Sequence, residues 1–258
     1  MGRFSNLEFG GNEPLREDEV PREEPRDERL YLRLADEDHR SARFERALRH
    51  YSRALEFNAN VAAAWVGQVQ MLVELGECEE ARLWADKALE IHRDHPDLLS
   101  VKAVAWARLG DAKRAIEFSD AALAQKGTTP QVWLARGEAL AAGGGGNSEY
   151  CFEKAAAESR QDWFMHLRVG RVCRHYGLYA RALAWVQKAI RREAGQPFLW
   201  HEQGECQAGL GSAAAAEASF EQALTLDPGF ALSRAALERL HDRGAFRRFW
   251  DRVRGMFR

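Results

Sequence analysis

Small apolar residues recur along this chain at a nearly constant interval. One series is spaced by 34, 34, 33, 34 and 34 residues: Ala54, Ala88, Ala122, Ala155, Ala189 and Ala223. A second series stands seven residues earlier in each interval: Ala47, Ala81, Ala115, Ser148, Ala182 and Ala216. A third series is glycine: Gly76, Gly110, Gly144, Gly177 and Gly211. Three series in one phase with this period predict a solenoid of stacked helical hairpins.

The phase of the series predicts where the two helices of each hairpin lie. The first helix begins near an aromatic residue and ends before the glycine, which adopts a left-handed conformation at low cost. The aromatic residues are Trp65, Trp133 and Trp200, and the prolines that open first helices are Pro96, Pro130 and Pro197. The second helix carries both small residues on one face, because they are two turns apart. Aromatic side chains fill the remaining space at Tyr51, Phe152 and Phe220.

The sixth interval carries the fullest set of characteristic residues: Trp200, Gly204, Gly211, Ala216, Phe220, Ala223, Leu224 and Pro228. These residues match the pattern W-x2-L-G-x2-Y…A-x3-F…P, so the chain resembles the tetratricopeptide repeat family over roughly four-fifths of its length. The resemblance implies an all-α fold, a right-handed superhelical solenoid of six helix-turn-helix hairpins. It implies six units at 28–61, 62–95, 96–129, 130–162, 163–196 and 197–230.

The fourth unit lacks one residue near Gly143–Gly146, which predicts a loosened turn and a flexible joint within the array. A capping helix is expected at 231–243, with Leu232, Ala236 and Leu240 turned inward. A basic amphipathic tail helix is expected at 244–258.

Charge is unevenly distributed, although the formal net charge is only −2. Residues 1–29 carry five arginines and nine acidic residues, whereas residues 231–258 carry eight arginines and three acidic residues. The acidic, proline-containing segment 1–27 is expected to be a disordered leader, because it has little apolar surface to bury. The near-neutral total gives no general attraction to nucleic acid, so no nucleic-acid partner is expected.

No motif in the sequence points to catalysis. The chain has no phosphate-binding loop, no H-E-x-x-H pair and no G-x-S-x-G elbow, so we expect neither an enzyme nor a cofactor. His92 and His95 lie one turn apart but lack a third metal ligand, so no metal site is expected. Four cysteines without C-x-x-C spacing predict buried free thiols in a reducing compartment. With no signal peptide or long apolar run, a cytoplasmic location is expected, with peripheral membrane association as an alternative.

The family resemblance implies that the first helices line a concave groove that binds protein partners. Positions five, nine, twelve and thirteen of each unit then point into it. The candidate groove residues are Leu32, Val66, Gln70, Leu134, Glu138, Leu167, Arg171, Arg174, His175 and His201. The apolar members favour a groove for an extended peptide or a helix, and the alternative is that they pack between neighbouring helices. In unit five, Arg171, Arg174 and His175 form a candidate basic patch that suits an acidic segment of a ligand.

One subgroup of the resembled family binds acidic chaperone tails through a carboxylate clamp. That clamp requires Lys and Asn at the fifth and ninth positions of one unit. No unit matches, since these positions hold pairs such as Leu32 and Asp36, or Val66 and Gln70. The chain is therefore not expected to be a co-chaperone of the carboxylate-clamp type.

The C-terminal segment is amphipathic if it is helical. Its apolar stripe is the candidate interaction face: Phe246, Phe249, Trp250, Val253 and Phe257. Arginines lie on the opposite face, a pattern typical of helices that adsorb to anionic membranes. The alternatives are packing on the sixth hairpin and docking of a partner. The sequence therefore predicts a non-catalytic scaffold or adaptor within a larger complex, or else a peripheral membrane assembly factor anchored by this helix.

Overall fold

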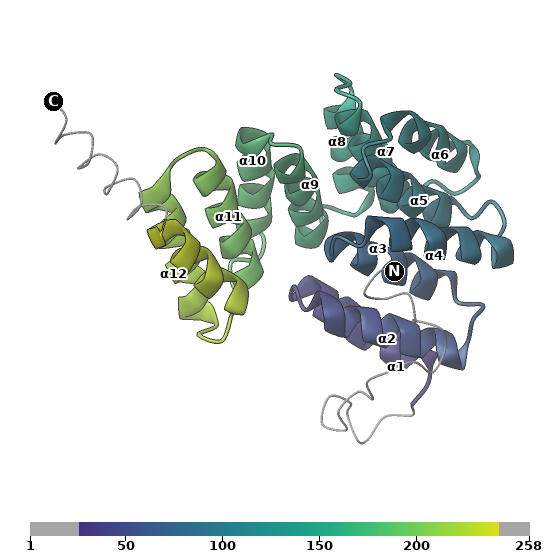
Figure 1. The fold of residues 1–258 in the computed structure, drawn as a ribbon, viewed down its shortest axis with the longest axis horizontal. Helices are drawn as coiled ribbons and strands as arrows, with labels where there is room; N and C mark the ends of the chain where they lie inside the picture. The colour runs from purple at the N-terminus through teal and green to yellow at the C-terminus, as the bar shows by residue number, and fades with distance from the viewer. Residues whose placement is uncertain (1–25, 243–258) are drawn as a thin grey trace, which may run out of the picture. The chain divides into compact units, whose positions relative to one another are not determined.

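A computed structural model describes residues 26–242 of the chain (Figure 1). Within these residues the structure is helical, without strands, and the predicted all-α fold is confirmed. The helices fall into two compact units, which divide between Arg160 and Gln161. The predicted leader and the predicted tail helix lie outside the described residues, apart from the last two residues of the leader.

The first compact unit, unit 1, contains four hairpins. They are α1 (Glu28–Arg40) with α2 (Phe44–Phe57), α3 (Ala62–Glu74) with α4 (Cys78–Ile91), α5 (Pro96–Arg108) with α6 (Ala112–Ala124), and α7 (Pro130–Ala142) with α8 (Ser148–Glu158). The first helices contact one another in order, α1 with α3, α3 with α5 and α5 with α7. Each of α2, α4 and α6 contacts its own first helix and the next one. Corresponding side chains of the first helices therefore lie in a row along one face of unit 1.

The second compact unit, unit 2, contains two hairpins and one further helix. The hairpins are α9 (Trp163–His175) with α10 (Tyr179–Ile190), and α11 (Pro197–Gly209) with α12 (Ala213–Leu226). Residues 231–242 are also helical. Ala236 of this helix is buried with Ala216 and Phe220 of α12, and Leu237 and Leu240 pack against them. Leu232, which we expected to face inward, is 40% exposed, and Ser233 is buried in its place.

The helix ends follow from local chemistry. Proline occupies the first turn of α5, α7 and α11, where a missing amide donor costs nothing. Gly76 ends the α3 turn with φ of 84°, and the other four glycines of the series also have positive φ. Hairpin one has Ala42 at the same position with φ of 58°. A left-handed alanine costs about 1–2 kcal/mol, so hairpin one retains this turn against the preference of its residue.

The short fourth hairpin is the last of unit 1. We expected a joint at its glycine turn, but the two compact units divide after its second helix. The glycine turn 143–146 joins α7 to α8, and these two helices pack together within unit 1. The division between the units follows α8, which has only 11 residues. Arg160 and Gln161 after it have φ of 54° and 60°, so two consecutive left-handed residues separate the hairpins. The missing residue therefore shortens the hairpin without dividing it.

The alanines of both series are fully buried, and in three hairpins a glycine of the first helix lies against a larger residue of the second. A Cβ on Gly137 would lie 2.3 Å from the Phe152 ring, and a Cβ on Gly204 would lie 2.5 Å from the Phe220 ring. In hairpin two the corresponding positions hold Val69 and Ala85, and both are buried. Because protein interiors are close-packed, a methyl group added at one of these glycines must displace the ring or side chain that it meets.

We expect Gly137→Ala to destabilise the protein even though alanine is the better helix former. The methyl group clashes with the Phe152 ring, and overpacking costs about 1–3 kcal/mol against a gain of about 1 kcal/mol in helix propensity. Thermal or denaturant unfolding measures the difference. The control is Gly146→Ala, because a Cβ at Gly146 meets nothing within 4 Å. A Gly137→Ala protein as stable as this control would contradict the close approach of the two helices.

Candidate functional site

The first-helix face of unit 1 presents half-buried apolar side chains. Leu32 of α1, Val66 of α3 and Val104 of α5 each pack against the buried core while keeping part of their surface exposed. Gln70 lies one turn beyond Val66, and its Nε2 donates a hydrogen bond to Oε1 of Gln131 on α7, at 2.9 Å. We call these five residues the unit 1 face. Leu32 and Val66 stand at the fifth position of their units, and Val104 stands one turn later, at the ninth position of its unit. The three therefore lie on the corresponding side of successive first helices, and we call them the apolar row.

The last candidate positions of unit 1 are more enclosed than the unit 1 face. Leu134 is only 3% exposed, within the packing of α7. Glu138 is 2% exposed and forms an ion pair with Arg108 of α5, which neutralises its charge. Glu138 therefore links α7 to α5, and Leu134 belongs to the buried core.

The apolar and aromatic candidates of unit 2 are also internal. Leu167 of α9 is fully buried. His201 of α11 is 7% exposed, with Nδ1 3.2 Å from Oγ of Ser233, and its ring lies against Phe198 and Phe220. Burial lowers the pKa of His201 below its ordinary value of 6.5, so the ring is neutral near neutral pH. Both residues therefore belong to the packing between hairpins.

The candidate basic patch of unit 2 contains a buried acid. Arg174 donates from Nε to Oε2 of Glu202 at 2.8 Å, and Arg171 pairs with the other carboxylate oxygen. Burial favours the neutral acid, but the two guanidinium groups outweigh it and hold the pKa of Glu202 below 4.5. Two positive charges thus share one internal negative charge. His175 is exposed beside them, with its ring centroid 4.8 Å from that of Tyr176.

Sequence reasoning missed Glu202, although a signal for it exists. The acid stands 31 residues after Arg171, and Glu138 stands 30 residues after Arg108. Residues separated by slightly less than one repeat lie on successive first helices. The second residue then stands about one turn before the position equivalent to the first, where the two side chains can meet. A base and an acid at this separation are therefore candidates for an ion pair between hairpins.

The remaining candidates are quickly placed. In residues 26–242 no group of three or more His, Cys, Asp or Glu side chains is arranged to hold a metal ion. The ring centroids of His92 and His95 are 6.2 Å apart. No helix of this part of the chain has the length and apolar character needed to cross a bilayer. The tail positions Phe246, Phe249, Trp250, Val253 and Phe257 fall after the last described residue.

Comparison with known proteins gives one consistent family. A model of the tetratricopeptide repeat matches residues 32–96, and a second model of this repeat matches residues 199–230. The matched segments lie in hairpins one and two and in hairpin six.

Solved structures give the same fold. A thermophilic tetratricopeptide repeat protein from Thermus thermophilus is 19% identical, with a TM-score of 0.51 over 83% of this chain and 98% of that chain. A tetratricopeptide repeat protein from Parabacteroides merdae is 19% identical, with a TM-score of 0.50 over 83% and 84%. The APC/C hetero-tetramer Cut9–Hcn1 contains a chain that is 13% identical, with a TM-score of 0.51 over 84% of this chain and 44% of that one. At these identities the likeness concerns the fold alone.

We expect Glu202→Gln to lower the stability of the folded chain by about 3 kcal/mol at neutral pH, because two largely buried arginines lose their counter-charge. The pH dependence follows from the lowered pKa of Glu202. In the wild type this contribution is complete above pH 4.5, the ordinary carboxyl value, and is lost as the pH falls through the lower folded value. The free energy of unfolding of the Glu202→Gln variant should therefore fall less than that of the wild type as the pH is lowered through this range.

Denaturant unfolding across this pH range measures both effects. The matched control is Glu205→Gln on the same helix, whose partner Arg239 is 58% exposed, so its loss should cost under about 1 kcal/mol. Equal losses for the two variants would contradict the internal role of Glu202.

Proposed function

The chain belongs to the tetratricopeptide repeat family, and we propose that it is a non-catalytic scaffold or adaptor that binds a peptide or helix of a partner protein. Arrays of such repeats generally act through extended binding surfaces rather than through chemistry. We place the binding surface on the unit 1 face. The observation that carries this proposal is the apolar row of Leu32, Val66 and Val104, one residue from each of three consecutive first helices.

The chemistry of the unit 1 face suits a partner segment that has apolar side chains and backbone N–H and C=O groups in need of hydrogen bonds. The apolar row supplies contacts that remove hydrocarbon surface from water on binding. The amides of Gln70 and Gln131, which now bond each other, offer donors and acceptors to a peptide backbone. The partner segment is therefore expected to alternate apolar and polar residues or to be an amphipathic helix.

A partner that ends in a clamped acidic carboxylate is not favoured. Asp36 is exposed on α1 and accepts a hydrogen bond from the Tyr51 hydroxyl at 2.6 Å, so a negative charge stands where a clamp needs an amide. Like charges at short range repel. We therefore maintain the proposal that the chain is not a carboxylate-clamp co-chaperone.

The thiols support a location in a reducing compartment, and we propose the cytoplasm. All four cysteines are free, and Cys151, Cys173 and Cys206 are buried. Burial raises the pKa of Cys206 to about 12, so this thiol stays protonated and unreactive.

Val66→Arg should weaken binding of the partner, because a charge replaces an apolar contact in the middle of the apolar row. Leu83→Arg on α4 is the matched control, since Leu83 belongs to the second helix of the same hairpin and is 54% exposed. Affinity capture with quantitative mass spectrometry compares the two with the wild type. We expect at least about a tenfold loss for Val66→Arg alone. Gln70→Ala, a smaller change, should weaken capture in the same direction, and equal recovery by all variants would refute this surface.

A second candidate function rests on the sequence of the tail, whose aromatic stripe and arginines suit an anionic membrane surface. It predicts that the full chain floats with vesicles of phosphatidylcholine and phosphatidylserine. A chain of residues 1–243 and the Trp250→Glu variant should then remain at the bottom of the gradient. Flotation that is unchanged in both variants, or absent in the wild type, removes the membrane function. Partner capture by residues 1–243 shows whether recognition needs the tail.

A further inference from the structure

Unit 2 contains a basic cavity that belongs to neither the unit 1 face nor the Glu202 ion pairs. Its volume is about 450 Å³, and it opens where α9 begins and α10 ends. The lining residues are Gln161, His166, Lys188, Arg191 and Arg192. Three of them are cationic and none is acidic. We call this the hairpin-five cavity.

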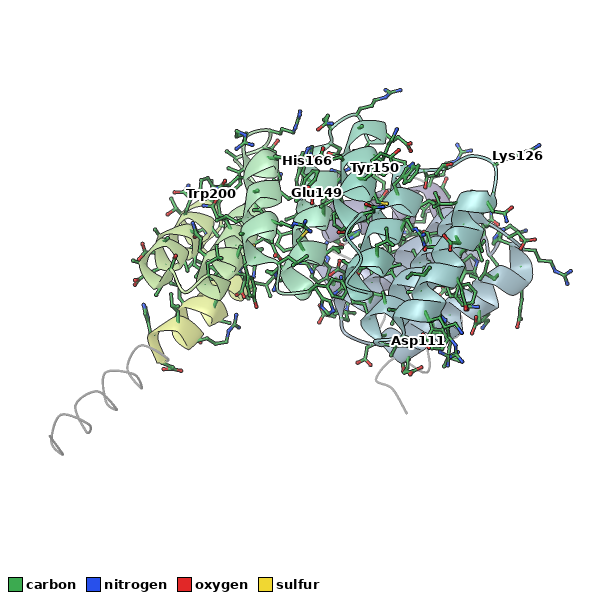
Figure 2. The ribbon with its side chains drawn as sticks, turned by 90° about the horizontal axis from the view of Figure 1, so that it is seen from above. Asp111, Lys126, Glu149, Tyr150, His166 and Trp200 are labelled. Carbon is green, nitrogen blue, oxygen red and sulfur yellow. The ribbon has the colours of Figure 1, made fainter. Side chains whose placement is uncertain are left out.

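One residue of the lining departs from the tryptophan that three hairpins carry at its position in the repeat. His166 occupies the aromatic position at which hairpins two, four and six carry Trp65, Trp133 and Trp200. Figure 2 labels His166 on α9 and Trp200 on α11. The imidazole is smaller than an indole, so it leaves room beside the helix. His166 is 2% exposed and held in place, with Nδ1 2.9 Å from the Asp162 carbonyl and its ring centroid 5.6 Å from that of Trp185.

Hairpin two provides an internal comparison, because it has the same framework and lacks the basic residues. In both hairpins a lysine lies over a tryptophan of the second helix: Lys87 Nζ is 4.7 Å from the Trp84 ring centroid, and Lys188 Nζ is 3.6 Å from that of Trp185. The two residues that stand at 191 and 192 in hairpin five are Glu90 and Ile91 in hairpin two.

None of the other hairpins carries an arginine at these two positions. They hold Glu56 and Phe57, Ala124 and Gln125, Ala157 and Glu158, or Thr225 and Leu226. Cations are favoured at the carboxyl end of a helix, but hairpins one and two place glutamate there, so the fold does not require them. The arginine pair therefore serves something other than helix stability.

The arginines of the cavity are available to a ligand. Arg191 and Arg192 are exposed, and within residues 26–242 neither takes part in an ion pair. Two acidic residues adjoin the lining in sequence, Asp162 after Gln161 and Glu193 after Arg192. Asp162 accepts from the amide of Phe164, and Glu193 accepts from the amide of Gly195. Lys188 is held in place by its contact with the Trp185 ring. The exposed side chains of Arg191 and Arg192 can reorient to contact a bound ligand.

We propose that the hairpin-five cavity binds a phosphate monoester group, carried by a phosphorylated serine or threonine of a protein partner. A phosphate monoester is close to a dianion at neutral pH and accepts hydrogen bonds on three oxygens, which suits two guanidinium forks and one ammonium group. A single carboxylate carries half that charge and has only two oxygens for the guanidinium groups. The assignment to a protein partner, rather than to a lipid, rests on the proposed scaffold function.

The test uses the full chain and a pool of short peptides with a fixed central phosphoserine and degenerate flanking residues. The same pool with serine or with glutamate at the centre provides the comparison, and isothermal titration calorimetry provides the affinities. We expect the phosphoserine pool to bind at least about tenfold more tightly than either comparison pool, with an affinity that falls as salt rises.

The variant Arg191→Glu/Arg192→Ile carries the residues of hairpin two and changes only exposed side chains. It should lose the preference for phosphoserine while its thermal unfolding stays unchanged. Arg181→Glu is the matched control, because Arg181 is an exposed arginine of α10 outside the cavity lining, and it should bind like the wild type. Equal binding of the phosphoserine and serine pools, or full binding by the double variant, would overturn the proposal.

Two further measurements identify the source of the phosphate. Inorganic phosphate should compete with the phosphoserine pool in the wild type. Vesicles of phosphatidylcholine with phosphatidic acid should bind no better than phosphatidylcholine alone, and binding that the double variant abolishes would overturn the assignment to a protein. The Val66→Arg experiment is independent of this cavity, so a failure here leaves the scaffold function standing.

Discussion

The close approach of the two helices within each hairpin is the constraint on which the rest of the structure depends. Small residues at two positions of the second helix are fully buried throughout the array, and a glycine of the first helix often faces an aromatic ring. Because the interior is close-packed, one methyl group at such a contact forces a displacement. In unit 1 the first helices also contact one another in order, so their exposed sides lie along one face of the unit.

Several charged side chains are buried inside the array, where they form ion pairs. Glu202 shares two arginines from the preceding first helix, and Glu138 pairs with Arg108 in the same sense. In hairpin one, Asp38 is 1% exposed and lies within 3.1 Å of Arg46 Nε and His50 Nδ1. Such pairs contribute little net stability over apolar packing, but loss of one partner is costly. An arginine counted as surface charge is thus often part of the interior.

The hairpins differ from one another at positions that the fold leaves free. The residues that maintain the helix separation repeat along the chain, whereas those at the ends of the second helices vary widely in charge and size. Hairpins two and five illustrate this, since they share the tryptophan and lysine pair and differ in the residues around it. Specific binding can therefore arise in one hairpin without disturbing its neighbours, because each repeat contacts only the next.

Much of the fold could be predicted from the sequence, because its determinants lie within one period. The all-α class, the six hairpins and the prolines that open α5, α7 and α11 follow from periodicity and backbone preference. The binding surface could not be derived to the same degree. Leu32 and Leu134 occupy the same position in the repeat, yet one is half-buried and the other is 3% exposed.

The sequence by itself determined the period, the helices and the residues that face each other within a hairpin, since these depend on short-range spacing. Only the tertiary structure decided which arginines are neutralised and that Leu237, not Leu232, faces α12. It also decided that the units divide at Arg160 rather than at the glycine turn. These outcomes depend on how successive hairpins are oriented, and that orientation is set by side chains about one repeat apart.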